Sequence, residues 1–249
     1  MGTKKKLNIL IVSPYFYPEN FRVNDIAQDL VQRGHSVTVL TGQPNYPDPD
    51  LFKEFRKRKV KSETWGGVQI HRVPIITRGR GGGIRRILNY LSFILSAPLF
   101  GFSQFKNKTF DVSFVWASSP ITSAIPALVW KWKTGTPVIV WVQDLWPETL
   151  KAVGVLKSKW GLQLVGLLVR WIYKHCNLLL AQSEGFVTAL RRWAPSLRRD
   201  RRRAPCRPRR PARGSRCFLR LSPTPLSQRP ALPTRSSGLA RVRDPEEPP

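Results

Sequence analysis

Two carboxylates, Asp144 and Glu148, closely follow an apolar run in the stretch VWVQDLWPETL, residues 140–150. Such a run predicts a buried strand, which places Asp144 two residues past the strand end, in a loop. A carboxylate held there could accept a proton, or a hydrogen bond from a sugar hydroxyl. Trp146 offers a flat face to a sugar or lipid, and Pro147 fixes the turn that aims Glu148. The plainer alternative is that Asp144 or Glu148 only caps the following turn.

Further polar side chains follow other apolar runs. Arg22 and Asn24 precede an expected helix N-terminus, where an anion is stabilised, although Arg22 could be a solvated charge and Asn24 an N-cap. Asn45 lies between prolines in GQPNYPDP, which suits a rigid ligand-binding loop or plain turn chemistry. Capping a helix is the main role expected of Ser119, and a hydrogen bond to a ligand is the alternative. The candidate catalytic residue is Asp144, and the candidate substrate-binding residues are Arg22, Asn24, Asn45, Ser119, Trp146 and Glu148.

The elements that must position these loops are six apolar segments that suit strands. They cover residues 7–13, 36–41, 68–73, 111–117, 137–142 and 177–183. Most are continuous rather than alternating, which is typical of parallel strands covered on both faces. Helical patterns near residues 23–35, 120–134 and 159–175 fit the crossovers between them. The sequence therefore predicts an α/β fold with a doubly wound, mainly parallel Rossmann-like sheet, whose ligands bind beyond the carboxyl ends of the strands.

Two kinds of site find no support in the sequence. No G-x-G-x-x-G motif follows the first apolar segment, which counts against an NAD-dependent dehydrogenase or epimerase. The three cysteines show no metal-ligand spacing, and neither His35 nor His71 has a carboxylate or a second histidine at useful spacing. We therefore predict no metal site and no bound cofactor.

The net charge of +27 is unevenly distributed along the 249 residues. Residues 191–249 carry 17 Arg, 11 Pro and only 4 acidic residues, and contain no Lys, Ile, Asn, Tyr, His or Met. That composition cannot make a core. We expect a folded domain over residues 1–195 and a disordered Arg/Pro-rich tail over 196–249. The tail has the composition of a shifted reading frame in GC-rich DNA, and a genuine RNA-binding arm is the alternative.

An uncharged segment of 19 residues, 87–105, lies between Arg85–Arg86 and Lys106–Lys108. Its length would admit a transmembrane helix. A crossing there would, however, separate strands that belong to one sheet. A helix lying in the membrane interface, with basic flanks near anionic headgroups, and an ordinary crossover helix buried on the sheet are the two main alternatives.

Two stretches of the sequence together resemble a known protein family. The stretch SPYFYPENFRVNDIAQDLVQRGHSVTVLTGQPNYP followed by VWVQDLWPETL resembles the N-terminal domain of family 4 glycosyltransferases, over about residues 7–195. The chain is most similar to bacterial transferases of capsule and O-antigen assembly that add an N-acetylfucosamine-like sugar. The resemblance implies half of a GT-B fold, metal-independent transfer from a nucleotide sugar with retention, and a lipid-linked sugar acceptor bound by this domain. It also implies a cytoplasmic protein, peripheral to the inner face of the inner membrane, with no specific nucleic-acid partner.

Residue by residue, Asp144 matches the position where relatives place a histidine or aspartate beside the transferred sugar. Glu148, Arg22 and Asn24 also match family motifs. The sequence NFRVN stands where many members have a Gly-Gly pair near the donor phosphates. Relatives continue into a second Rossmann half that holds the nucleotide, whereas here SEGFVTALRRWAP runs into the Arg/Pro-rich tail. We expect a truncated transferase that is inactive alone. A non-catalytic basic protein that binds membrane or RNA is the alternative.

Overall fold

The computed structural model describes residues 5–53, 55, 61–79, 83–154, 156, 158–193, 198–199 and 219–222. The strands of the main sheet are β1 (Asn8–Val12), β2 (Ser36–Gly42), β3 (Ser62–Trp65), β4 (Val68–Val73), β5 (Val112–Ala117), β6 (Val138–Val142) and β7 (Leu178–Ala181). Six of these confirm the predicted strands. The strand missed by sequence reasoning is β3, a short edge strand joined to β4 by Gly66 and Gly67, both at positive φ.

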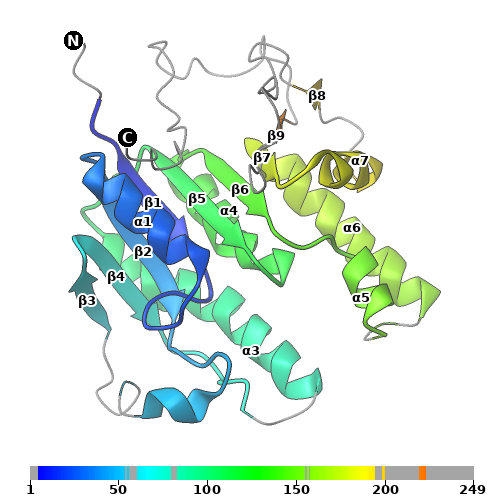
Figure 1. The fold of residues 1–249 in the computed structure, drawn as a ribbon, viewed down its shortest axis with the longest axis horizontal. Coiled ribbons are helices and arrows are strands. Elements are labelled where there is room, and N and C mark those ends of the chain that lie inside the picture. Colours follow the sequence, from blue (N-terminus) through cyan, green and yellow to red (C-terminus); the bar gives the residue numbers. More distant parts are fainter. Residues whose placement is uncertain are drawn as a thin grey trace, which may run out of the picture.

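The sheet has the order β3-β4-β2-β1-β5-β6-β7, with β9 (Leu219–Ser222) and β8 (Arg198–Arg199) beyond β7 (Figure 1). Strands β4, β2, β1, β5, β6 and β7 pair in parallel, and β3 pairs antiparallel with β4. This arrangement confirms the predicted α/β Rossmann-like sheet. Because the six strands are parallel, their carboxyl ends meet at one edge.

Helices cover both faces of the sheet. Helix α1 (Arg22–Gln32) lies on one face, and α3 (Gly83–Ser96), α4 (Ile125–Thr134) and α6 (Lys159–His175) pack on the other. Short helices η1 (Pro49–Phe52), η2 (Ala97–Gly101), η3 (Phe102–Phe105), η4 (Ile121–Ala124) and α5 (Glu148–Ala152) join these elements, and α7 (Glu184–Trp193) follows β7.

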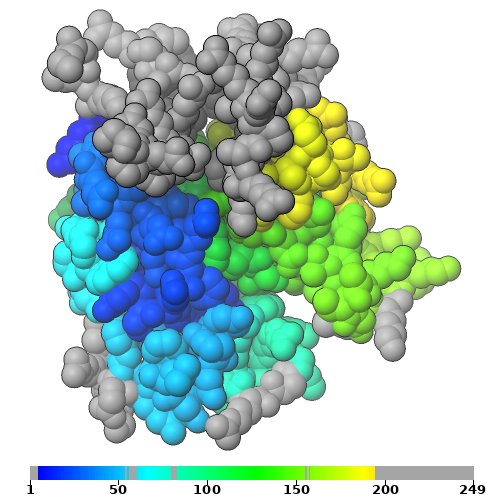
Figure 2. Space-filling view, viewed as in Figure 1, coloured from blue at the N-terminus to red at the C-terminus, as the bar shows by residue number. Residues whose placement is uncertain are grey.

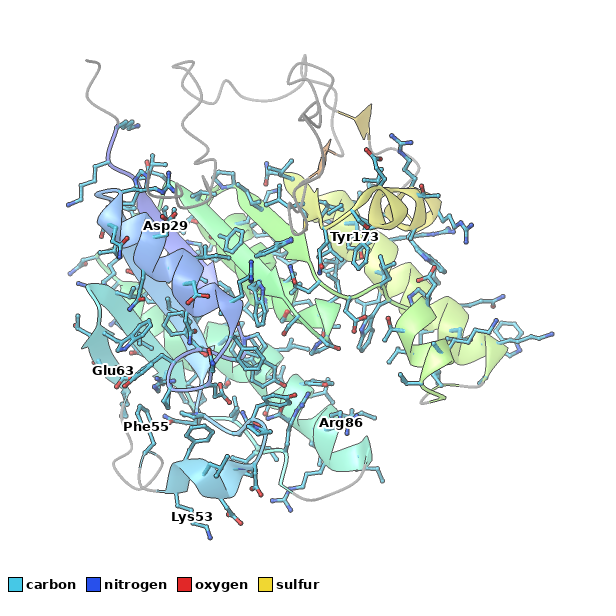
Figure 3. The ribbon with its side chains drawn as sticks, viewed as in Figure 1. Asp29, Lys53, Phe55, Glu63, Arg86 and Tyr173 are labelled. Carbon is cyan, nitrogen blue, oxygen red and sulfur yellow. The ribbon has the colours of Figure 1, made fainter. Side chains whose placement is uncertain are left out.

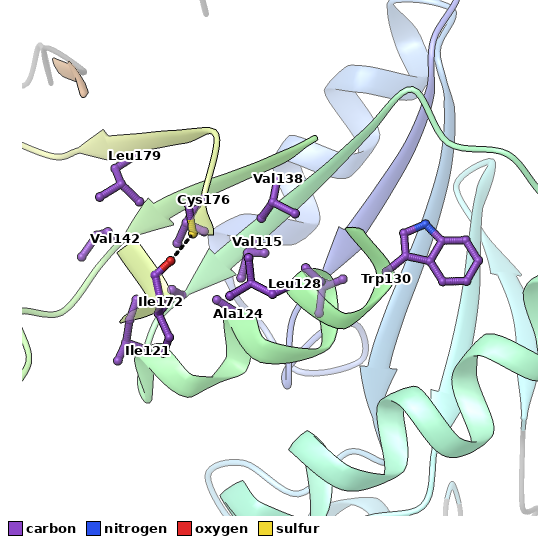
Figure 4. Packing of buried hydrophobic residues seen from close by; sticks show 14 of the residues in the cluster. Val115, Ile121, Ala124, Leu128, Trp130, Val138, Val142, Ile172, Cys176 and Leu179 are labelled. Carbon is purple, nitrogen blue, oxygen red and sulfur yellow. Dashed lines mark hydrogen bonds between the residues drawn. The ribbon is translucent and has the colours of Figure 1, made fainter. Parts of the chain in front are cut away.

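The alternation of side chains along each strand builds the two cores. In β1, Leu10 and Val12 face the cluster under α3, α4 and α6, whereas Ile9 and Ile11 face the cluster under α1. Figure 4 shows the first cluster, in which the buried Cys176 thiol donates to the Ile172 carbonyl at 3.1 Å. Apolar side chains on both faces explain why the strands read as continuous apolar runs.

Helix α3 is a crossover helix between β4 and β5 that also exposes apolar residues. Phe93 and Ala97 are buried in the core, while Leu91, Leu95 and Leu99 are 48%, 63% and 70% exposed. The segment Gly83–Phe105 is long and apolar enough to cross a membrane, although a third of it is buried in the fold, and such a helix alone is weak evidence. Helix α3 packs on the sheet as a crossover helix and leaves one apolar face open, so its docking in a membrane interface stays a prediction.

Most of the expected tail, 196–249, lies outside the described residues. Two short strands within it are described, β8 (Arg198–Arg199) and β9 (Leu219–Ser222), and β9 pairs antiparallel with β7. The domain boundary at residue 195 and the disorder of the tail stay predictions.

Candidate functional site at the carboxyl edge of the sheet

The loops after β1 and β2 are joined by the carboxylate of Glu19, which is 2% exposed. Its Oε1 accepts the backbone N–H groups of Asn45 at 2.8 Å and Tyr46 at 2.7 Å. Its Oε2 accepts the backbone N–H of Phe16 at 3.2 Å. These loops cannot pair with each other as strands do, so the carboxylate supplies the acceptors that their buried N–H groups need.

Burial raises the pKa of Glu19 to about 7, and the three backbone N–H donors and the positive charge of Arg72 act in the opposite direction. Arg72 is itself buried and ion-paired with Glu63 on β3, and its guanidinium also donates to the carbonyls of Gly42 and Tyr17. Figure 3 shows Glu63 beside Phe55, whose ring the guanidinium covers at 4.7 Å. A titratable acid therefore lies under the candidate site with its pKa near neutrality.

Asn45 is fully buried and links three segments at this edge. Its Oδ1 accepts Nδ2 of Asn89 on α3 at 3.2 Å and the backbone N–H of Arg78 after β4 at 3.4 Å. Its Nδ2 donates to the carbonyl of Gln43 at 3.1 Å. The prediction that Asn45 touches substrate stays untested, and these contacts favour a role in holding the loops.

Asp144 lies two residues past the end of β6, as predicted, and is partly exposed. Its Oδ1 accepts the Thr149 hydroxyl of α5 at 2.5 Å. Its Oδ2 makes no hydrogen bond to the residues that the structure describes. One oxygen is thus fixed by the following helix, and the other remains available to a ligand.

Glu148 and Trp146 turn inward. Glu148 begins α5 and accepts the indole N–H of Trp193 on α7 at 2.6 Å. Trp146 packs against the core under α4 and α6, and its indole nitrogen is buried without a partner. The predicted open sugar-binding face of Trp146 is therefore largely covered. Beneath them, burial together with the charges of Glu148 and Asp144 raises the pKa of Tyr173, which Figure 3 places on α6.

Two expectations about helix starts are wrong. Arg22 and Asn24 do not precede α1 but lie in its first turn, because extended Phe21 is the N-cap. Asn24 is instead buried, and its Nδ2 donates to the Glu19 carbonyl at 2.8 Å. Arg22 is exposed. Ser119 does not cap η4, because Pro120 holds the N-cap position without a side-chain hydrogen bond.

The structure thus brings the predicted residues into two groups. Asn24 and Asn45 meet through Glu19, whereas Asp144, Trp146 and Glu148 cluster around α5, and no hydrogen bond joins the two groups among the described residues. Sequence reasoning missed Glu19 and Arg78. The signal for Glu19 was an acid within YPEN, enclosed by aromatic residues and proline after a buried strand.

No group of three or more His, Cys, Asp or Glu side chains in the described part of the chain is arranged to hold a metal ion. His71 instead contacts Gln104 Oε1 at 2.9 Å and Lys108 Nζ at 3.1 Å. His35 accepts the backbone N–H of Leu7 at 3.2 Å. These contacts fit ordinary structural roles for the two histidines.

Comparison with known proteins decides the family. Residues 20–205 match the family model of the glycosyl transferase 4-like domain. The chain belongs to this family. The match covers the candidate residues from Arg22 to Glu148, and it supports a glycosyltransferase function for the domain. No curated protein matches the chain.

Proposed function

We propose that this glycosyl transferase 4-like domain binds the acceptor of a glycosyl transfer. The observation that carries the proposal is the position of Asp144, which lies at the carboxyl edge of the sheet with Oδ2 free of hydrogen bonds to the described residues. The domain around it belongs to the glycosyl transferase 4-like family. The reaction moves a sugar from a nucleotide sugar to a lipid-linked acceptor, with retention at the anomeric carbon and without a metal. Its setting is the synthesis of bacterial surface polysaccharide, including capsule and O-antigen.

Asp144 is the catalytic residue in this proposal. The Thr149 hydroxyl orients the carboxylate, so that Oδ2 accepts a hydrogen bond from a hydroxyl of the reacting sugar. Arg22 and Ser119 lie at the same edge and supply further contacts to substrate. Arg22 is exposed, and Ser119 caps no helix.

Helix α3 gives this site access to a lipid acceptor. Its exposed apolar residues form a stripe at helical spacing that Leu99 of η2 extends; those on α3 are Ile84, Ile87, Leu88, Leu91 and Leu95. Arg85 and Arg86 begin the stripe, and Lys106 and Lys108 follow it; Figure 3 shows Arg86 on α3. Such a helix can lie in the interface of an anionic membrane. We therefore propose peripheral attachment to the cytoplasmic face of the inner membrane.

The donor side of the reaction requires groups that stabilise the leaving nucleoside diphosphate. In this proposal a second Rossmann-like half supplies them, as the family resemblance implies. The glycosyl transferase 4-like domain then binds the acceptor, and the other half binds the nucleotide sugar.

A second candidate function comes from the charge of residues 191–249, which carry 17 of the 42 basic residues of the chain. A non-catalytic protein that binds RNA or anionic membrane through this arginine-rich segment would show affinity that falls steeply with salt.

Binding of the full chain to vesicles separates the two candidates. We expect it to co-sediment with phosphatidylcholine vesicles that contain a polyprenyl diphosphate-linked sugar, and far less with phosphatidylcholine vesicles that carry phosphatidylglycerol at equal charge. Single-stranded RNA should not compete. Equal binding to both vesicles, together with tight and salt-sensitive RNA binding, would contradict acceptor binding and favour the second candidate.

A further inference from the structure

Arg78 lies just past the end of β4, with its guanidinium among three tyrosine rings from three segments. The carbon of the guanidinium is 5.3 Å from the ring centre of Tyr15, 5.4 Å from that of Tyr46 and 5.2 Å from that of Tyr90. Its Nη2 donates to the Tyr90 hydroxyl. Aromatic faces attract a cation and fix its orientation, so this side chain is held in place before any ligand arrives.

Among the described residues, Arg78 has no anionic partner, and no carboxylate forms an ion pair with it. Its Nε is buried without a hydrogen bond, and Nη1 makes none to the residues that the structure describes. Tyr15 beside it is 3% exposed, and its hydroxyl is also buried without a partner. Buried polar groups normally find partners, so a guanidinium with free N–H donors next to the ring of a tyrosine whose hydroxyl has no partner indicates a site for an anion.

An apolar groove approaches this cluster along α3. It has a volume of about 350 Å³ and is lined by residues of α3, η2 and the segment after β4, among them Ile75, Leu95, Leu99 and Phe100. Ile75 also lines a narrow adjoining pocket together with Asn89 and Tyr90. Tyr90 in turn receives the hydrogen bond from Arg78. The groove and the Arg78 cluster therefore lie near each other along α3, linked through Ile75 and Tyr90.

We propose that Arg78, held by Tyr15, Tyr46 and Tyr90, binds the diphosphate of a polyprenyl diphosphate-linked acceptor, whose prenyl chain occupies the groove along α3. The inference rests on the proposed function, because it takes the acceptor to be lipid-linked. An arginine fork matches phosphate oxygens with paired donors, and the groove matches an isoprenoid chain. The sugar attached to the diphosphate would then lie at the carboxyl edge of the sheet, where Asp144 stands.

The test measures vesicle binding of the full chain and of four variants. The vesicles are phosphatidylcholine with a polyprenyl diphosphate, phosphatidylcholine with phosphatidylglycerol at equal charge, and phosphatidylcholine alone. The variants are Arg78→Gln, Arg78→Lys, Tyr90→Phe and Arg33→Gln. Arg33 lies beyond α1 on the other side of the sheet and pairs with Asp29 at 2.7 Å, so its substitution removes the same charge elsewhere. Circular dichroism checks that each variant is folded.

We expect Arg78→Gln to weaken binding to the diphosphate vesicles by at least ~10-fold, because hydrogen bonds to a charged group are lost. Arg78→Lys and Tyr90→Phe should lose part of the affinity, and Arg33→Gln should stay within about twofold. Inorganic pyrophosphate should compete with the diphosphate lipid for the wild-type chain and for Arg33→Gln, and should have no effect on Arg78→Gln.

Three results would overturn the inference. Unchanged diphosphate binding by folded Arg78→Gln would remove Arg78 from the site while leaving acceptor binding intact. An equal loss of binding by Arg78→Gln to phosphatidylglycerol vesicles would show that Arg78 binds anionic lipid in general and not the diphosphate of the acceptor. Failure of the wild-type chain to bind the diphosphate lipid at all would overturn the proposed function as well.

Discussion

Glu19 shows, at the scale of one residue, how a buried acid can join two loops. Its carboxylate accepts three backbone N–H groups, from Phe16, Asn45 and Tyr46, and these bonds fix the loops that follow β1 and β2. The cost of this arrangement is the desolvation of a charge, which raises the pKa of Glu19 from 4.5 to about 7.

Stability should therefore depend on pH through Glu19. Because its pKa is raised on folding, its contribution is fully present below pH 4.5 and is lost as pH rises through about 7. The loss amounts to roughly 3 kcal/mol. Glu19→Gln stays neutral throughout, so urea unfolding should show its stability rising relative to wild type by about that amount between pH 4.5 and 8. Parallel pH profiles of the two proteins would contradict this assignment.

Gly166 controls the contact between helices α6 and α7 at the scale of elements. A methyl group there would lie 2.2 Å from the Trp193 ring, and Trp193 donates its indole N–H to Glu148 on α5. Gly166→Ala should lower the free energy of unfolding by about 1–3 kcal/mol, since the rigid indole must move. Gly185→Ala on α7 is the matched control, because its nearest neighbour is 3.7 Å away. Equal stability of the two variants in urea titrations would show that this contact is loose.

The elements could be predicted from the sequence better than the site could. Continuous apolar runs revealed six parallel strands, because each such strand is covered on both faces. The edge strand β3 escaped because SETW carries a weaker pattern, although the Gly66–Gly67 turn beside it was visible. Arg78 could not be found, because its three tyrosines come from segments far apart in the chain. Trp146 was expected to offer a flat face to a sugar or lipid, and its partial burial against the core depends on packing that only the folded chain reveals.

At the scale of the whole molecule, α3 and α6, on one side of the sheet, each expose several apolar residues. Besides α3, helix α6 exposes Leu164 and Leu167, at 70% and 61%. Figure 2 shows α5 and α6 projecting at one end of the molecule. The groove lies along α3 and Arg78 contacts it through Tyr90, so the proposed membrane docking belongs to α3 and not to α6.

Paired substitutions distinguish these two helices. The double variant Leu91→Gln and Leu95→Gln on α3 should bind anionic vesicles at least ~10-fold more weakly, because it removes two apolar side chains from the interface. The matched variant Leu164→Gln and Leu167→Gln on α6 should stay within about twofold in co-sedimentation. The reverse order of the two effects would place the membrane contact on α6.

The central claim is that the loop after β6 presents Asp144 to the acceptor of a glycosyl transfer. The most direct measurement is transfer of a labelled sugar from its nucleotide to a polyprenyl diphosphate-linked acceptor, with the nucleotide-binding half of an active family member added separately. We expect transfer that depends on this chain, at least ~10²-fold slower with Asp144→Ala and nearly unchanged with Asp111→Asn at the opposite edge. Unaltered transfer by Asp144→Ala would contradict the claim.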